Sequence, residues 1–379
     1  MKLIIDENIA FAEEAFSTLG NLKLLDGRNL KNEDVKDADV LIVRSVTNVD
    51  ENLLRNSKVK FVGTATIGTD HIDLDYLQKY KIKFSDAKGC NADSVTEYVF
   101  TALFKIASEN SISLKGKTIG IVGAGNIGSR VVRIAEFLGM KVLKNDPPLE
   151  RKGIGKDYVS LSEALSADII TFHVPISYEG VDKTFHLLDQ NNLKKIKEGA
   201  IIINSSRGAV IDNSELLSES NRKDLELVID VWEDEPSINT NLLLKTKIAT
   251  PHIAGYSFEG KVNGTKIIYD AVCRYLKVLP TWKPKLPHME FNELELPKSS
   301  NEAKRLYKLF SSIYNIKKDD EQMRKIIDYK PGERAAYFDL LRKKYPLRRE
   351  FSNYSVKISN EESHLKTFLE NLHFKVEVP

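Results

Sequence analysis

Short runs of hydrophobic residues alternate with amphipathic stretches along most of the chain. Runs such as Val40–Val43, Phe61–Thr64 and Ala200–Asn204 are mostly apolar at consecutive positions, which is typical of parallel strands buried on both faces. The stretches between such runs carry apolar residues at helical spacing, as at Ile9–Leu19 and Glu51–Asn56. The pattern therefore predicts α/β domains in which helices cover both faces of doubly wound parallel sheets.

Two long amphipathic stretches predict helices that connect two such domains. One begins near Asn91, and Ser94–Glu97 has the spacing of an N-terminal capping box. The other spans Phe258–Leu276 and returns the chain to the first domain. The expected domains are residues 1–93 with 258–285, which bind the substrate, and residues 94–257.

A proline-rich segment, Leu279–Pro287, marks a further boundary, because proline disfavours both helix interiors and central strands. Residues 286–379 are expected to form a small α+β domain. Its predicted elements are helices at Glu302–Ile313, Asp319–Tyr329, Glu333–Lys344 and Asn360–Leu372, with strands at Tyr354–Ile358 and at the chain end.

A glycine-rich loop, Gly123-Ala124-Gly125-Asn126-Ile127-Gly128, follows the predicted strand Thr118–Val122 and leads into a helical pattern. In this context Gly123 allows a tight turn, Gly125 lets the backbone approach a pyrophosphate, and Gly128 lets the helix lie close to the strand. Asp146 ends the next predicted strand, where a carboxylate can bind the ribose of NAD and repel the extra phosphate of NADP. We therefore predict a Rossmann-like domain that binds NAD.

Three chemically different side chains, Arg207, Glu235 and His252, follow other predicted strands of this domain. Because the carboxyl ends of parallel strands line one crevice, we expect them to lie close together. His252 can take the proton of a hydroxyl group, and Glu235 would orient the imidazole and favour its protonated form. Arg207 offers a planar fork for a carboxylate. Each residue alone could be a surface charge or a structural histidine, but together they predict oxidation of a 2-hydroxy acid.

The composition narrows the class of protein. A chain with 42% hydrophobic and 29% charged residues fits a soluble protein, and a net charge of +2 gives no general attraction to nucleic acid or membranes. Cys90 and Cys273 lack metal-ligand spacing, and neither a signal peptide nor an apolar segment of membrane length is recognised. We therefore expect a cytoplasmic protein with reduced thiols and no metal site.

Four ordered motifs resemble those of the D-isomer-specific 2-hydroxyacid dehydrogenases. The motifs are Gly123–Gly128, Asn204–Gly208, Asp230–Pro236 and Thr250–Gly255, within a resemblance that covers roughly residues 1–280. The resemblance implies catalytic roles for Arg207, Glu235 and His252. It implies NAD contacts, in addition to the glycine loop, at Asp146, Val174, Ser205, Ser206, Arg207, Asp230 and Gly255. It also implies substrate contacts at Ser45, Thr66 and Tyr256, and Arg44 supplies a cation beside Ser45.

Within this family, Val43–Thr47, Gly63–His71 and the turn at Asp146–Pro148 resemble the branch whose substrate is 4-phospho-D-erythronate. That branch implies oxidation at C2 to (R)-3-hydroxy-2-oxo-4-phosphooxybutanoate, a step toward pyridoxine 5'-phosphate, by a homodimer. Two alternatives stay open. One is a dehydrogenase of phosphoglycerate or glycerate, and the other is an NAD-sensing binding module that resembles the C-terminal binding protein corepressors.

The C-terminal segment is short and has little core of its own, so we expect it to form the dimer. Its basic run, Arg342–Lys344 with Arg348 and Arg349, is interpreted as a solvated face. Arg342, Arg348 and Arg349 are nevertheless candidates to bind the substrate phosphate of the partner subunit, because the arginine fork matches phosphate oxygens.

Overall fold

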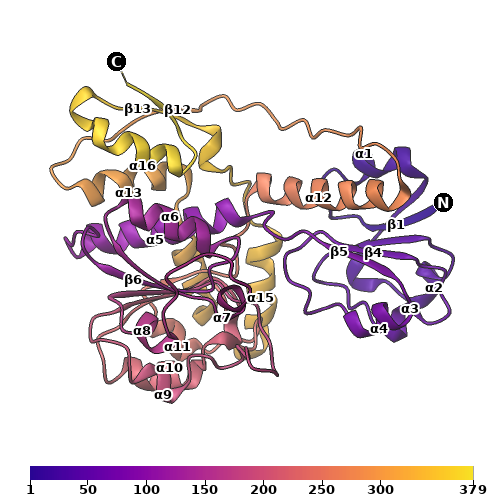
Figure 1. Cartoon of the computed structure of the whole chain (residues 1–379), viewed down its shortest axis with the longest axis horizontal. Coiled ribbons are helices and arrows are strands. Elements are labelled where there is room, and N and C mark those ends of the chain that lie inside the picture. Colours follow the sequence, from indigo (N-terminus) through magenta and orange to yellow (C-terminus); the bar gives the residue numbers. More distant parts are fainter. Residues whose placement is uncertain (379) are drawn as a thin grey trace. The chain divides into compact units, whose positions relative to one another are not determined.

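A computed structural model describes residues 1–378. The chain forms two compact units (Figure 1): unit 1 comprises Met1–Asn91 with Ser257–Glu290, and unit 2 comprises Ala92–Tyr256 with the chain from Phe291 onward. Both units contain parallel sheets and helices, which confirms the predicted fold class. Among residues 1–378, no helix combines the length and the apolar character needed to cross a membrane.

The sheet of unit 1 has five parallel strands in the order β2-β1-β3-β4-β5. Successive strand residues face opposite sides, so Leu3 and Ile5 pack with α1 and α12 while Ile4 belongs to the core on the other side. The strands are β1 Lys2–Asp6, β2 Asn21–Leu25, β3 Val40–Val43, β4 Phe61–Thr64 and β5 Lys83–Asp86. The helices are α1 Ala12–Phe16, α2 Asn32–Val35, α3 Glu51–Leu54, α4 Leu74–Lys79 and α12 Phe258–Leu276, with 3₁₀ turns at Ser17–Leu19 and Gly27–Asn29.

Helix α12 packs closely on the end of β4. A Cβ atom added to Gly264 would lie 3.0 Å from the backbone oxygen of Ala65, so the lack of a side chain permits this approach. Further along the helix, Ile268 and Val272 are fully buried in the core of unit 1. The first turns of α12 therefore lie near the carboxyl end of the central strands of this sheet.

The large sheet of unit 2 has six parallel strands in the order β11-β10-β9-β8-β6-β7. The chain leaves β6 toward β7 on one side and then continues through β8 on the other, which makes the topological switch point of a doubly wound sheet. The strands are β6 Thr118–Val122, β7 Lys141–Asn145, β8 Ile169–Phe172, β9 Ile201–Asn204, β10 Glu226–Ile229 and β11 Ile248–Ala249. The helices are α5 Ala92–Glu109, α6 Gly128–Phe137, α7 Pro147–Arg151, α8 Leu161–Leu165, α9 Gln190–Leu193, α10 Asn213–Ser220 and α11 Thr240–Lys245, with a 3₁₀ turn at Gly208–Val210.

The C-terminal segment adds helices and a small parallel sheet of three strands to unit 2, in the order β12-β13-β14. The predicted helices are present, with the second and fourth beginning or ending in 3₁₀ turns. The elements are β12 Glu293–Glu295, α13 Glu302–Ile313, α14 Ile316–Arg324, α15 Pro331–Lys343, β13 Ser355–Lys357, α16 Lys366–Asn371 and β14 Lys375–Glu377, with 3₁₀ turns at Lys325–Asp328, Phe351–Asn353 and Asn360–Leu365.

This segment shares a hydrophobic core with α5 instead of forming one alone. Phe104 of α5 lies edge-on to Phe310 of α13 and to Phe368 of α16, with ring centroids 5.5 and 5.8 Å apart. Figure 1 shows α13 and α16 beside α5 and α6. Deletion of the segment would therefore uncover an apolar face of α5. That residues 286–379 form a separate dimerisation domain stays a prediction.

Two expectations about this region are wrong. Helix α5 begins at Ala92, so Ser94 and Glu97 lie inside it and do not form a capping box. The hydroxyl of Ser94 donates to the backbone oxygen of Ala254 at 2.8 Å.

The basic run is not a solvated face throughout, because Arg348 and Arg349 are buried, with 5% and 7% of their surface exposed. A segment packed against the same chain can bury charges that look exposed in the sequence.

Candidate active site

The glycine loop joins β6 to α6. Gly123 has a φ of 93°, and a Cβ atom there would lie 2.7 Å from the backbone oxygen of His173 and 2.9 Å from Val174 Cγ1. A Cβ atom on Gly128 would lie 1.9 Å from the backbone oxygen of Gly123. Gly125 has no such neighbour within 4 Å, so an added methyl group would enter open space. Gly125 is thus the glycine of this loop that leaves room for a pyrophosphate.

Asp146 follows β7 and fastens the glycine loop. Its Oδ2 accepts the backbone N–H of Ala124 at 2.8 Å, and its Oδ1 accepts that of Leu149 at 3.0 Å at the start of α7. Asn126 and Ile127 lie in the turn directly before α6. The carboxylate therefore lies beside the loop, as its predicted role in choosing NAD over NADP requires.

Two polar atoms at the carboxyl ends of β8 and β9, His173 Nδ1 and Ser205 Oγ, are buried and make no hydrogen bond within residues 1–378. Burial lowers the pKa of the His173 ring to about 3, so the ring is neutral at pH 7. Buried polar atoms usually have hydrogen-bond partners, and these two fit a polar ligand such as NAD. Ser206 is already engaged, since its backbone N–H and hydroxyl donate to Asn204 Oδ1 at 3.1 and 2.9 Å.

Arg207 lies on the loop after β9. Asn204 Nδ2 donates to the backbone oxygen of Arg207 at 2.9 Å, and Arg207 Nη1 donates to that of Ser206 at 2.8 Å. The next residue, Gly208, contacts the loop after β10, because an added Cβ would lie 2.0 Å from the backbone oxygen of Trp232. This contact keeps the loop of Arg207 beside the loop that leads to Glu235.

Asp230 organises the loop that carries His252. The carboxylate is 1% exposed. It accepts the Thr250 hydroxyl at 2.6 Å and the backbone N–H groups of Ile253 and Ala254 at 2.8 and 3.0 Å. The backbone N–H of His252 donates to the backbone oxygen of Asp230 at 2.7 Å. Asp230, which the family resemblance assigns to NAD, is thus a structural support of the loop that carries His252.

Glu235 and His252 form the predicted pair. Nδ1 of His252 contacts Glu235 Oε1, and Glu235 Oε2 accepts the backbone N–H of Trp232 at 3.2 Å. Burial alone would raise the pKa of the Glu235 carboxyl, but the imidazole of His252 and the charge of Arg342 lower it overall. The carboxylate therefore remains ionised, and Nε2 is the ring nitrogen left to exchange a proton.

Arg342 of α15 joins this group from the C-terminal segment. Its guanidinium lies 5.8 Å from the centre of the Tyr256 ring, and its charge lowers the pKa of the Glu235 carboxyl. Gly255, directly before Tyr256, is partly exposed. Interpreting Arg342 as a solvated residue is therefore wrong, because its own chain places it near the Glu235–His252 pair.

Glu233 differs from Glu235 although it is only two residues away. It pairs with His186, whose Nε2 lies 2.5 Å from Glu233 Oε1 and whose Nδ1 lies 3.4 Å from Asp212 Oδ2. These three side chains have the spacing of metal ligands. A carboxylate faces each ring nitrogen, so His186 links the loops that carry Asp212 and Glu233.

The substrate residues predicted before residue 91 lie in unit 1. Arg44, after β3, forms an ion pair with the fully buried carboxylate of Asp6, with Arg44 Nε 2.9 Å from Asp6 Oδ2. Ser45 next to it is exposed. Thr66, after β4, is partly exposed, and its hydroxyl donates to the backbone oxygen of Gly68 at 3.2 Å. These residues therefore gather at the carboxyl edge of the same sheet.

Lys261 is a second cation near Arg44 that the sequence analysis missed. It lies in the first turns of α12, three residues before Gly264, which touches the chain after β4. Burial of the ammonium group and the charge of Arg44 lower the pKa of Lys261, although much of the residue is exposed. Its helical spacing from Gly264 could have indicated which face of α12 it occupies.

Comparisons with known proteins agree with this geometry. Residues 92–254 match the D-isomer specific 2-hydroxyacid dehydrogenase, NAD binding domain, and residues 285–372 match a domain of unknown function. An erythronate-4-phosphate dehydrogenase from Proteus mirabilis is 44% identical over 95% of this chain and 96% of its own length. One from Shewanella halifaxensis is 43% identical over 99% of both chains.

Solved structures support the same fold. The structure of a D-lactate dehydrogenase from Aquifex aeolicus, complexed with NAD and lactic acid, matches with a TM-score of 0.61 and 28% identity, over 73% of this chain and 96% of that one. A 3-phosphoglycerate dehydrogenase from Entamoeba histolytica with bound NAD+ matches with a TM-score of 0.64 and 26% identity, over 73% and 95% of the two chains. The protein is thus an NAD-dependent dehydrogenase. Its similarity to curated relatives over nearly its whole length shows that the chain belongs to the erythronate-4-phosphate dehydrogenase family.

Proposed function

We propose that this protein oxidises 4-phospho-D-erythronate at C2 to (R)-3-hydroxy-2-oxo-4-phosphooxybutanoate, in the route to pyridoxine 5'-phosphate. The observation that carries the proposal is the contact between Glu235 and His252 Nδ1, on loops next to that of Arg207. The names of the relatives at 43–44% identity support the choice of substrate.

The proton chemistry follows from the orientation of His252. Because Nδ1 faces a carboxylate, the neutral ring carries its proton there and Nε2 is the acceptor. Nε2 then takes the proton of the C2 hydroxyl group, and Glu235 stabilises the imidazolium that forms. Arg207 pairs with the substrate carboxylate and polarises the developing carbonyl. The glycine loop and Asp146 would hold NAD, which would supply the acceptor for the hydride that leaves C2.

The direct test measures absorbance of the reduced nicotinamide with purified protein. We expect the highest kcat/KM with 4-phospho-D-erythronate and NAD, and much lower values with 3-phosphoglycerate, glycerate or NADP. A higher kcat/KM for 3-phosphoglycerate would reject the substrate but not the dehydrogenase chemistry. Equal use of NAD and NADP would reject the role of Asp146.

We propose that the substrate phosphate is bound with the help of Arg44 and Lys261, because two cations at one edge of a sheet suit a doubly charged group. Lys261→Met should raise the KM for 4-phospho-D-erythronate about tenfold through loss of a charge-assisted contact. It should leave the KM for unphosphorylated D-erythronate unchanged. The control is Lys266→Met, since Lys266 pairs with Asp270 on the same helix. Equal changes with both acids would show that Lys261 does not bind the phosphate.

The open space at Gly125 tests how the chain holds NAD. Gly125→Ala should fold normally but bind NAD at least about tenfold more weakly, because a methyl group would occupy the place of the pyrophosphate. Calorimetric titration with NAD measures the change. Gly332→Ala is the matched control, since that glycine also has no neighbour within 4 Å. Unchanged NAD affinity in Gly125→Ala would place the pyrophosphate elsewhere.

We propose that the protein is a cytoplasmic homodimer that associates through its C-terminal segment. Leu347 in this segment is 64% exposed, which suits a contact with a second copy. Leu347→Glu should therefore produce monomers in sedimentation velocity experiments. Leu244, at 61% exposure, lies outside the segment and provides the control Leu244→Glu, which should remain dimeric. A Leu347→Glu protein that sediments like the unmodified protein would argue against this interface.

A further inference from the structure

Arg348 links the C-terminal segment to the loop that carries the catalytic histidine. Its Nη2 atom donates to the backbone oxygen of Ala254 at 2.7 Å and to that of Ser94 at 3.1 Å, and it also contacts the Ser94 hydroxyl. The guanidinium lies 4.3 Å from the centre of the Tyr314 ring. With 5% of its surface exposed, Arg348 is committed to its own chain, which contradicts its suggested role in the partner's phosphate site.

Ala254 is only two residues from His252, so this link acts on the catalytic loop directly. On one side, the carboxylate of Asp230 accepts the N–H groups of Ile253 and Ala254. On the other side, Ala254 presents its oxygen to Arg348. The segment Ile253–Ala254 is thereby held at its backbone N–H groups by Asp230 and at the backbone oxygen of Ala254 by Arg348. A displacement of a catalytic group by about 1 Å can lower the rate about 10²-fold. Loss of these contacts, which together form a clamp, should therefore lower kcat.

Other contacts reinforce the clamp at the same place. Tyr345, three residues before Arg348, lies edge-on to Tyr256, with ring centroids 5.8 Å apart. The backbone N–H of Phe351 donates to the buried Glu97 at 2.7 Å. Burial raises the pKa of the Glu97 carboxyl well above its usual value, as does the charge of Glu350. The chain on both sides of Arg348 is thus fixed to α5 and to the loop after His252.

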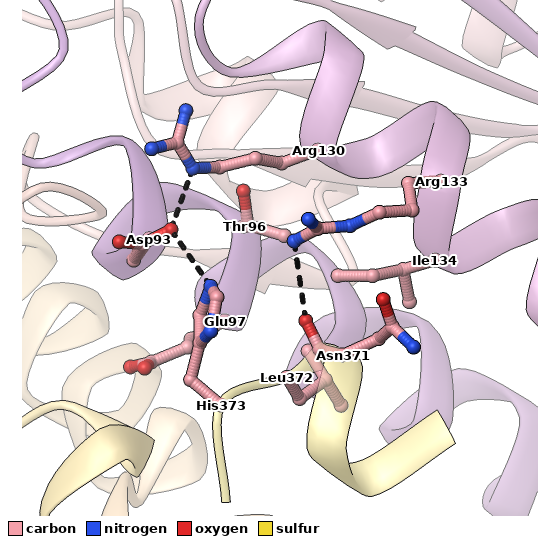
Figure 2. Close-up of a pocket in the computed structure, with 9 residues that line it drawn as sticks. All are labelled: Asp93, Thr96, Glu97, Arg130, Arg133, Ile134, Asn371, Leu372 and His373. Carbon is pink, nitrogen blue, oxygen red and sulfur yellow. Dashed lines mark hydrogen bonds and ion pairs between the residues drawn. The ribbon is translucent and has the colours of Figure 1, made fainter. Parts of the chain in front are cut away.

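The first turn of α5 is held from a second direction as well. Asp93 Oδ1 lies 2.6 Å from Arg130 Nε of α6 and 3.4 Å from His373 Nε2 of the C-terminal segment (Figure 2). Figure 2 also shows Arg133 directed to the backbone oxygen of Asn371, at 3.4 Å. Ser94, the partner of Arg348, therefore lies on a helical turn that is itself anchored.

We propose that Arg348 is a positioning residue for the dehydrogenation: through Ala254 and Ser94, the C-terminal segment of each chain holds the loop of its own His252 in catalytic geometry. Arg348 itself does not contact the reacting atoms. This segment then contributes to catalysis within one chain, independently of its role in assembly. The inference rests on the proposed function of His252.

The test compares Arg348→Lys, Arg348→Met and Ser94→Ala in the full-length protein. Arg348→Met should lower kcat at least about tenfold, with less than a twofold change in the KM for substrate and in the Kd for NAD. Arg348→Lys should recover part of kcat, because an ammonium can still donate to Ala254. Ser94→Ala, which keeps the charge of Arg348, should give a smaller loss of kcat. The control is Arg305→Lys, since Arg305 binds Pro297 and Glu362 within the C-terminal segment.

Hydrogen exchange provides a readout that does not depend on the substrate. The amides of residues 252–256 should exchange faster in the Arg348 variants than in unmodified protein, while those of β6 should not change. A folded Arg348→Lys with unchanged kcat and unchanged exchange would overturn the proposal, as would equal losses of kcat in Arg305→Lys. If both Arg348 variants fail to fold, Ser94→Ala decides: unchanged kcat and exchange reject the clamp. If the proposed function itself is wrong, the unmodified protein will show no turnover of 4-phospho-D-erythronate, which distinguishes that outcome from rejection of the clamp.

Discussion

Replacement of His252 by asparagine is expected to lower kcat by about 10²–10⁴-fold, the usual contribution of a general acid–base group. Asparagine can still donate a hydrogen bond to Glu235, so the loop should keep its shape, but it has no ring nitrogen to accept the hydroxyl proton. The Kd for NAD should stay near that of the unmodified protein, because the glycine loop is unchanged. Steady-state kinetics and an NAD titration measure the two effects.

The matched control for this variant is His364→Asn. His364 is exposed and pairs with Glu302 in the C-terminal segment, away from the Glu235–His252 pair. Turnover of this control should equal that of the unmodified protein. Near-normal turnover in His252→Asn itself would remove His252 from the mechanism.

Replacement of Glu235 by glutamine is expected to have the second largest effect, a loss in kcat/KM on the order of 10-fold to 10²-fold. Glutamine keeps the shape of the side chain but removes the negative charge beside His252 Nδ1. The pH profile of kcat/KM should move to lower pH, because the imidazolium loses the carboxylate that stabilises it. Glu233→Gln is the control, since Glu233 pairs with His186.

The same variant also predicts how the free energy of unfolding changes with pH. The pKa of the Glu235 carboxyl is lowered in the folded protein from its usual value of 4.5. Its interactions therefore stabilise the fold above pH 4.5 and are lost as the pH falls through the lowered pKa. The difference in unfolding free energy between Glu235→Gln and the unmodified protein should be largest near neutral pH. An unchanged pH profile together with unchanged stability would mean that Glu235 does not act on His252.

Local patterns in the sequence predicted most of the fold. The central strands, such as β3, β6 and β9, are buried on both faces, and their apolar runs are therefore continuous. Of the strands that were not predicted, β2, β5 and β12 lie at sheet edges and are partly exposed, whereas β8 is central and buried. Because an edge strand mixes polar and apolar residues, its pattern resembles that of a loop.

The candidate site was predicted where each residue follows a strand with a recognisable motif. The glycine loop, Glu235 and His252 belong to this group, because strand ends of a parallel sheet converge by topology alone. The sequence predicted that Asp146 lies beside the glycine loop, but it did not predict the hydrogen bonds of Asp146 with Ala124 and Leu149. Such contacts depend on loop conformations that no short pattern encodes.

By itself, the sequence determined the doubly wound sheets, the glycine-rich turn between β6 and α6 and the pairing of a histidine with a carboxylate. Strand burial, glycine geometry and strand order are local or topological properties. Only the tertiary structure decided the surroundings of Arg342, Arg348 and Lys261. A basic residue has the same sequence appearance whether it faces solvent or is buried against another segment. Its environment is set by the packing of distant segments, here the C-terminal segment on α5 and the first turns of α12 beside β4.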